Sequence, residues 1–275
     1  MRQSTSRRIK DSAAIIVAMG VGAWWVASLE SSLARTPLAT GYLLFGSVLF
    51  LAAYQLRKRL PGLPLGSSRS WLRAHLIVAV LTAPLFYWHT AGRWPNGILE
   101  GVLAAVYAAT FLSGVWGLYL SRTIPRQLAR LPEQHLYERV PRLQRGIANE
   151  ARDAVMAVVH EMGADTLANF YADRLHGFFG RPRSFAYALS PTASTRKRLF
   201  RELASSDRYF TDGERKTAER LFALIRRKDD LDFHASRQGL LKLWLLVHIG
   251  LTWSLVSLAV VHGIVALAFL GGPTA

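Results

Sequence analysis

The chain has 275 residues, 51% of them apolar, and it carries 34 Lys and Arg against 18 Asp and Glu, a formal net charge of +16. Continuous apolar blocks beside so strong a positive charge are unusual in a soluble domain and typical of a membrane protein with basic cytoplasmic segments. The sequence has no cysteine, which excludes disulfides, thiolate-bound zinc, iron–sulfur clusters and covalently attached c-type haem within this chain. The basic residues lie between the apolar blocks rather than along one face, so nucleic-acid binding is not expected.

Five apolar segments have about the 20 residues that a helix needs to cross a bilayer. They are Ala13–Leu29, Pro37–Leu56, Trp71–His89, Ile98–Leu120 and Leu240–Leu270. The basic tail before the first segment is interpreted as leading into a retained span, since no small-residue cleavage site followed by a soluble chain is evident. The expected fold is all-α: an integral membrane bundle of five transmembrane helices with a helical cytoplasmic insertion.

Charge placement predicts the orientation of these spans. The N-terminal tail has four Lys and Arg, and the 57–73 connection has five, whereas the intervening loops hold only Arg35 and Arg93. By the positive-inside rule the N-terminus is cytoplasmic and the C-terminus lies outside, in an inner (cytoplasmic) membrane. The third and fifth spans then run in the same direction.

A basic, mainly polar insertion separates the last two spans. The expected domains are therefore 1–121 with four transmembrane helices, 122–238 as a cytoplasmic helical loop domain, and 239–275 with the fifth helix and a short outer tail. No dinucleotide or P-loop motif occurs in the insertion. Its histidines match no metal-ligand spacing and are interpreted as solvated or structural; they are His135, His160, His176 and His234.

Helical periodicity is clear in two parts of the insertion. An amphipathic pattern runs from about Arg145 to Phe179. A second helix is expected to begin near Thr211, because Thr211 and Glu214 have the spacing of a capping box. After that helix the chain is expected to re-enter the bilayer beyond Asp232.

Four histidines lie in the apolar segments, and they form two pairs of equal spacing. Fourteen residues separate His75 from His89, and fourteen separate His248 from His262. At 3.6 residues per turn, fourteen residues return a helix to within about 40° of the same face, roughly 21 Å further along its axis. On parallel helices His75 therefore faces His248 near the cytoplasm, and His89 faces His262 near the outer surface.

Two facing histidine pairs predict two b-type haems, each held between two imidazoles without a covalent link. The simpler interpretation is hydrogen bonding between helices, or polar residues in a hydrated cavity; ionisable residues within spans are nevertheless rare and usually functional. A zinc site is less favoured, because zinc needs three or four ligands at one depth and no carboxylate lies near these histidines in the sequence.

Other residues are candidates for holding the haems. Gly114 and Gly117 on the fourth span would let a broad planar group approach, although glycine is also an ordinary packing device in membrane helices. Arg73, Arg93 and Lys242 lie near the histidines in the sequence and could bind propionates, or serve as snorkelling anchors at the membrane surface.

The paired 14-residue histidine spacings resemble those of the membrane dihaem cytochrome b superfamily, which includes the cytochrome b of quinol–cytochrome c reductases and the ferric reductase-like transmembrane core. The resemblance covers the third to fifth spans, with Trp71–His75 and Leu241–His248 as its most distinctive segments. It implies axial-ligand roles for the four histidines. The chain departs from ferric reductases and NADPH oxidases in lacking a flavin and nicotinamide domain, and from quinol–cytochrome c reductases in having five spans and a 122–238 insertion.

The expected function is that of a transmembrane dihaem b-type cytochrome, the electron-transfer subunit of a multisubunit oxidoreductase complex. Its expected partners are membrane lipid, a quinone or quinol, and an extracytoplasmic redox protein of the c-type cytochrome class. Two alternatives remain open: a ferric reductase-like core served by a separate cytoplasmic flavoprotein, and a haem-free membrane anchor whose basic insertion docks a partner.

Overall fold

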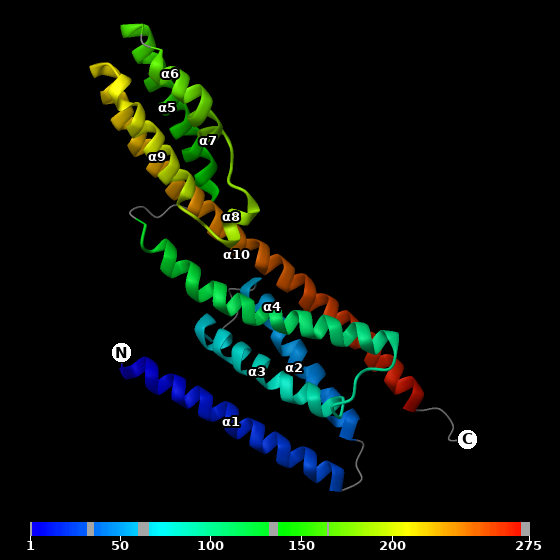
Figure 1. Cartoon of the computed structure of the whole chain (residues 1–275). Helices are drawn as coiled ribbons and strands as arrows, with labels where there is room; N and C mark the ends of the chain where they lie inside the picture. Colours follow the sequence, from blue (N-terminus) through cyan, green and yellow to red (C-terminus); the bar gives the residue numbers. More distant parts are fainter. Residues whose placement is uncertain (1, 32–35, 60–65, 132–136, 164, 271–275) are drawn as a thin grey trace. The chain divides into compact units, whose positions relative to one another are not determined.

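A computed structural model describes residues 2–31, 36–59, 66–131, 137–163 and 165–270, and within these ranges the chain is helical and has no strand (Figure 1). The longer helices are α1 (Arg2–Ser31), α2 (Thr36–Arg59), α3 (Ser68–His89), α4 (Ile98–Leu128), α5 (Val140–Met162), α9 (Ser194–Ser206) and α10 (Asp212–Leu270). The shorter elements are α6 (Thr166–Phe170), α7 (His176–Gly180), α8 (Phe185–Leu189), the turns η1 (Tyr137–Arg139) and η3 (Asp207–Tyr209), and one π-helical turn, η2 (Tyr171–Leu175).

Two compact units make up the chain. The first, called here the spanning unit, comprises Met1–Val115 and Leu246–Ala275; the second, the insertion unit, comprises Trp116–Leu245. Helices α4 and α10 each contribute one part to the spanning unit and one part to the insertion unit.

Within the residues that the structure describes, four helices are long and apolar enough to cross a membrane, so the expectation of a multi-pass helical membrane protein is confirmed at this level. They are Thr36–Gln55 within α2, all of α3, all of α4, and α10. The apolar part of α1, Ile15–Ser31, is shorter than these and is not one of the four. The expected count of five spans therefore remains a prediction for the first segment.

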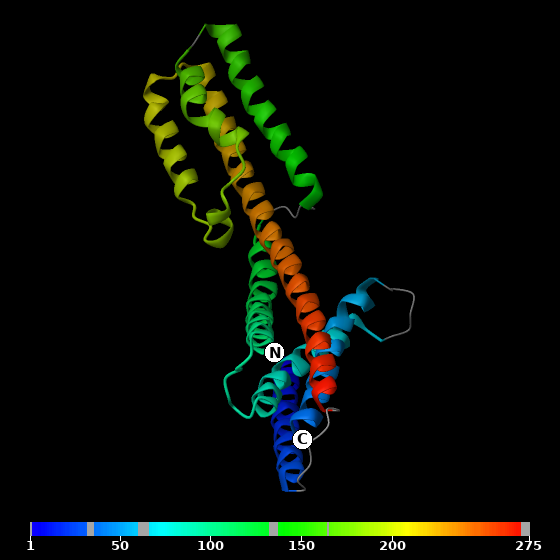
Figure 2. The same cartoon turned by 90° about the vertical axis from the view of Figure 1, so that its right-hand side faces the viewer.

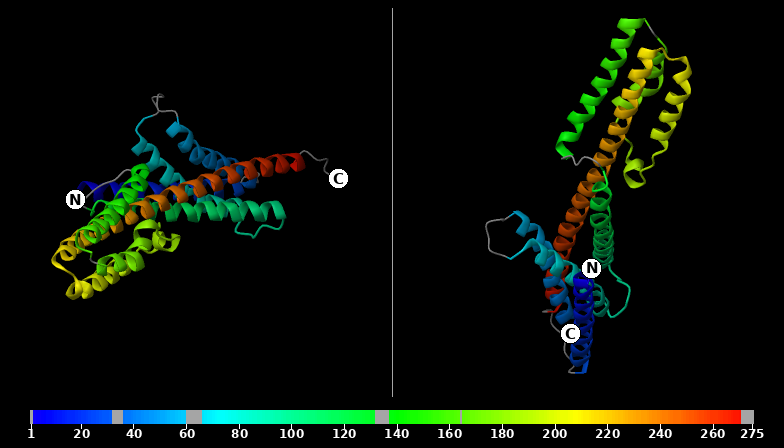
Figure 3. Two further views of the ribbon diagram at one scale, coloured as in Figure 1. Left: turned by 90° about the horizontal axis from the view of Figure 1, so that it is seen from above. Right: turned by 90° about the vertical axis from the view of Figure 1, so that its left-hand side faces the viewer.

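In the spanning unit, α2 and α3 run antiparallel beside each other, and α1 packs against both (Figure 3). Helix α3 and the last part of α10 run in the same direction, as expected from the charge distribution (Figure 1). A small apolar core joins α2, α4 and α10; its buried members are Val48, Ala52, Leu255 and Val256.

The insertion unit is a helical bundle with a continuous core. Figures 1 and 2 show α5, α9 and the first part of α10 lying side by side. The almost fully buried leucines of this core come from α6, η2, α9 and α10, among them Leu167, Leu175, Leu199, Leu203 and Leu221. Burying apolar surface from water stabilises such a bundle by about 25 cal/mol per Å².

The helix expected over 145–179 is wrong as a single element. Helix α5 ends at Met162, and Gly163 follows it with a φ of 61°. This left-handed conformation favours glycine, and the Gly163 amide donates to the carbonyl of Val159, which closes the helix. The rest of the amphipathic segment forms α6, the π-helical turn and α7.

The helix start expected at Thr211 is confirmed. The Thr211 amide donates to the Glu214 carboxylate over 2.9 Å, and the Glu214 amide donates to the Thr211 hydroxyl over 3.4 Å, the two bonds of a capping box. The expected separation of this helix from the last span is wrong, because α10 continues unbroken from Asp212 to Leu270. The acidic residues at 229–232 lie inside it, paired with basic side chains instead of ending the helix.

Candidate functional site

The side chains of His89 and His262 come together in the spanning unit. His89 is the last residue of α3, and its ring centre lies 6.3 Å from that of His262 on α10, with the ring planes 89° apart. Two imidazoles bound end-on to one metal ion through nitrogen bonds of about 2 Å each would hold their ring centres roughly 6 Å apart. The separation therefore suits two axial ligands of one iron atom.

A hydrogen bond sets the tautomer of His89. Its Nδ1 lies 3.0 Å from the carbonyl oxygen of Pro37 and 3.4 Å from the hydroxyl of Thr40, both at the start of α2. A carbonyl only accepts, so Nδ1 carries the proton and donates it to Pro37. The lone pair of Nε2 is then available to a metal, which is the usual arrangement of a metal-binding imidazole and its supporting carbonyl.

His248 is held in the same manner by a different residue. Its Nδ1 lies 2.6 Å from the hydroxyl oxygen of Ser113 on α4, and that hydroxyl donates its single proton to the carbonyl of Thr110 over 3.1 Å. With the Ser113 proton on Thr110, the Ser113 oxygen can accept from Nδ1 of His248, an arrangement that leaves Nε2 unprotonated. The carbonyl partner fixes the tautomer of His89, and the hydroxyl partner of His248 is compatible with the same tautomer.

His75, the remaining histidine, lies on α3 beside the ring of Tyr54 on α2, with ring centres 5.3 Å apart and planes tilted by 44°. All four histidines are partly buried. His75 and His248 are placed by different neighbours on separate helices, and their pairing remains a prediction.

Glycines admit two of the histidine rings. A Cβ atom at Gly41 of α2 would lie 2.9 Å from Cε1 of His89, closer than real Cβ atoms approach, so only glycine leaves this ring its place. A Cβ atom at Gly114 would lie 3.6 Å from Cε1 of His248, which is ordinary contact. The donor chemistry and this close approach at Gly41 fit a group ligated by imidazole.

The layer between the two histidine levels is packed with other side chains. On α3 the buried Thr82 and Leu85 lie between His75 and His89, and Tyr107 of α4 donates to the Thr82 hydroxyl over 3.0 Å. On α10 the buried Leu255 and Val256 occupy the same position between their two histidines. Buried residues therefore separate the histidine levels in sequence on both helices.

The remaining predicted site residues have other neighbours. In the insertion unit Trp244 packs onto Gly117 so closely that a Cβ atom there would overlap its ring. Lys242 pairs with Glu138 over 3.0 Å and lies 4.0 Å from the ring centre of Tyr137. That hydrogen bond from Lys242 lowers the pKa of the Glu138 carboxyl. Arg73 and Arg93 are exposed.

Sequence reasoning missed the residues that orient the histidines: Pro37, Thr40 and Ser113. Their signal is weak, because a hydroxyl residue in a membrane helix usually bonds to its own helix, as Thr40 does to the carbonyl of Thr36 over 2.8 Å. Residues that orient a histidine can be recognised only from the packing of α2 and α4 against the helices that carry the histidines.

Comparisons with known protein families, with curated proteins and with solved structures found no match. What the fold defines is a multi-pass helical membrane protein. Among the described residues, no three His, Asp or Glu side chains converge as they would around a zinc ion. A site with two imidazole ligands needs only two protein side chains.

Proposed function

We propose that the chain is a transmembrane dihaem b-type cytochrome that transfers electrons between a quinone pool and an extracytoplasmic redox partner, in keeping with a c-type cytochrome. The carrying observation is the His89–His262 pair: two ring centres 6.3 Å apart, one of the rings locked with its Nε2 lone pair exposed. The proposal assigns His89 and His262 to one haem, and His75 and His248 to the second.

The residues of the chain have separable roles in this proposal. The four imidazoles would hold the haems, and the haems would supply one-electron carriers. Pro37 and Ser113 orient two of the rings and raise their basicity by accepting the Nδ1 protons. The buried layer around Thr82 and Leu255 keeps water out of the space between the histidine levels.

Docking of the external partner is proposed at the 90–97 connection, which follows His89 directly. This turn is short, and it exposes Trp94 almost completely, at 87%. An exposed aromatic residue beside a redox site is a suitable contact for a transient protein partner. The orientation with this connection outside and the insertion unit cytoplasmic belongs to the proposal and follows from the charge asymmetry.

The first experiment is haem quantification by the pyridine haemochrome method on the purified chain. Two haems per chain with a low-spin ferric spectrum are expected. The His262→Leu variant should lose one haem of the two, because only one of its ligands to that iron remains, whereas the control His160→Leu, exposed on α5, should retain both. A chain without a Soret band would contradict the proposal and favour a haem-free anchor.

The second experiment tests the proposed path of electrons from quinol to the external acceptor. With His262→Leu, a quinol analogue should still reduce the remaining haem, and transfer to an external acceptor should stop. Undiminished transfer through this variant would contradict the proposed path. Reduction by NAD(P)H only after a cytoplasmic flavoprotein is added would indicate the ferric reductase-like alternative.

A further inference from the structure

Helix α8 of the insertion unit presents two large apolar side chains to its surroundings. Phe185 and Leu189 are four residues apart, which places them on one face of the helix, and they are 59% and 51% exposed. Ala188 on the same short helix is buried, so α8 is oriented with its larger apolar residues outward. Adjacent exposed apolar side chains of this size mark an interaction surface.

A hydrogen bond from Arg237 fixes the position of α8 along α10. Its guanidinium donates to the carbonyl oxygen of Ala188 over 3.0 Å, and Arg237 itself is only 9% exposed. Arg237 precedes Leu240, where the last apolar stretch begins, by three residues, or about 4.5 Å along the helix. Helix α8 is therefore held close to the level where the apolar stretch of α10 begins, within the insertion unit.

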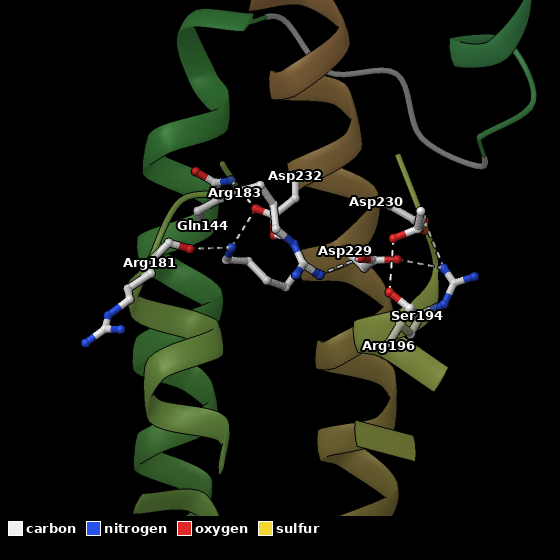
Figure 4. A network of polar contacts seen from close by, with 10 residues as sticks. Gln144, Arg181, Arg183, Ser194, Arg196, Asp229, Asp230 and Asp232 are labelled. Atoms are coloured by element: carbon white, nitrogen blue, oxygen red, sulfur yellow. Dashed lines mark hydrogen bonds and ion pairs between the residues drawn. The ribbon is translucent and has the colours of Figure 1, made fainter. Parts of the chain in front are cut away.

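A buried ionic network fixes the segment just before α8 (Figure 4). Arg183 pairs with Asp229 over 2.9 Å and with Asp232 over 3.2 Å, both on α10. Lys228 pairs with Asp232 over 2.5 Å and donates to the carbonyl of Arg181 over 3.5 Å. Buried charges are costly to desolvate, so the network adds little net stability. Its pairs hold Arg183, and with it the segment before α8, against α10.

Aromatic residues of the same unit indicate that this level is a membrane interface. Leu120 of α4 and Leu240 of α10 pack in one buried apolar cluster, which places the neighbouring Tyr119 at the level of Leu240. Tyr119 and Trp116, whose ring centres are 5.5 Å apart, are exposed at the end of the apolar stretch of α4. Exposed Trp and Tyr at the end of an apolar stretch are characteristic of the aromatic belt at the lipid headgroups.

We propose that the Phe185–Leu189 face of α8 inserts into the boundary between headgroups and acyl chains, as an interfacial contact of the insertion unit with the lipid bilayer. Lipid is the occupant that the structure favours, because Arg237 holds α8 close to the start of the apolar stretch at Leu240, and Leu240 packs with Leu120, the neighbour of the belt residue Tyr119. Amphipathic elements of this kind lie about 5–10 Å deep in that boundary. The inference rests on the membrane helices and does not require the haem proposal.

The absence of cysteine from the sequence makes a direct test practical. Single cysteines replace Phe185, Leu189 or, as a control, Tyr209, and each full-length variant is spin-labelled in phosphatidylcholine–phosphatidylglycerol nanodiscs. Tyr209 is a matched control because it is 63% exposed and lies about 40 Å before Arg237 along the direction of α10. Accessibility of each label to oxygen and to a water-soluble nickel chelate gives its depth.

Labels at Phe185 and Leu189 should be several-fold more accessible to oxygen than to the chelate, with the reverse at Tyr209. Equal chelate accessibility at all three positions would overturn the proposal. Protection of Phe185 and Leu189 from both reagents would also overturn it, because a protein partner or second copy would then cover α8.

A second variant tests the role of Arg237. Arg237→Gln should reduce the depth at Phe185, whereas a label at Leu246 of the last span should stay deep. Unchanged depth at Phe185 would show that the Arg237 bond does not hold α8 at the membrane. Haem spectra of the same samples report separately on the proposed cytochrome function.

Discussion

The two units of the chain use polar residues in opposite ways. In the insertion unit, apolar side chains form the core, and the buried charges of Lys228, Asp229 and Asp232 fix one segment against α10. In the spanning unit few residues are buried; most of its Ser and Thr hydroxyls bond within their own helix, while Pro37 and Ser113 contact histidines of other helices. Burial of apolar surface from water stabilises a bundle such as the insertion unit, whereas lipid exerts no such force between membrane helices. Contacts between helices of the spanning unit therefore depend more on close packing and on single hydrogen bonds.

Removal of one buried charge should have the largest effect on stability. The buried Lys228 ammonium donates hydrogen bonds to Asp232 and to the carbonyl of Arg181. Asp232→Leu removes the first partner and leaves the carbonyl of Arg181, at 3.5 Å. Burial already raises the pKa of Asp232 despite the neighbouring Lys228, which shows how costly charge is at this position. The insertion unit should lose about 3–5 kcal/mol, measured by hydrogen exchange of the α5 and α9 amides.

Two controls accompany this variant. The double variant Lys228→Met/Asp232→Leu should recover most of the loss, because no unpaired charge remains between those positions. Glu150→Gln, which breaks the exposed pair with Arg220, should change stability by less than about 1 kcal/mol. A single variant as stable as the double would show that the network is not a coupled unit.

The next largest effect on stability is expected from the removal of a leucine side chain, and it should differ between the two units. Leu221→Ala in the insertion unit removes a fully buried side chain and should cost about 3 kcal/mol. The matched Leu246→Ala on the same helix, 69% exposed in the spanning unit, should change stability little, because its side chain faces lipid. Hydrogen exchange of the α10 amides near each position measures both, and equal losses would contradict the comparison.

Alkaline pH should weaken the insertion unit through Tyr187. Burial, with a further contribution from Asp229, raises the pKa of Tyr187 to about 12. A raised pKa gives stability that is present below the ordinary value of about 10 and is lost as pH rises towards 12. Tyr187→Phe should remove about 1–2 kcal/mol of this dependence once solvent screening is allowed for, whereas Tyr209→Phe, at an exposed position, should not alter it.

The smallest effect on stability is expected in the spanning unit, at Ser113. Ser113→Ala removes the acceptor for Nδ1 of His248 and should cost about 1 kcal/mol or less, as hydrogen bonds between membrane helices usually contribute. Under the proposed function its effect is on redox chemistry: the midpoint potential of one haem should rise, because His248 becomes a weaker base. The control Ser47→Ala breaks only a bond within α2, and an equal shift there would contradict the assigned role.

Helix positions and types could largely be predicted from the sequence alone. Apolar length identified α2 and α3 to within about three residues of their observed ends and the start of α4, which continues eight residues beyond the expected Leu120 to Leu128; the Thr211–Glu214 capping box located the start of α10. Both signals act within one helix, so neighbouring residues suffice to read them. The continuity of α10 through Asp229–Asp232 escaped prediction, because three aspartates within four residues indicate a helix end until their basic partners are known.

The residues of the candidate site also fall into two groups, those that the sequence predicts and those that only the tertiary structure identifies. Equal spacing on one helix face identified the four histidines, since helical geometry is local. Only the tertiary structure could supply Pro37, Ser113 and Gly41, because each acts on a histidine of another helix, and the contact depends on how helices pack. Tertiary packing also directed Lys242 to Glu138 and Gly117 to Trp244, neighbours that no sequence spacing specifies.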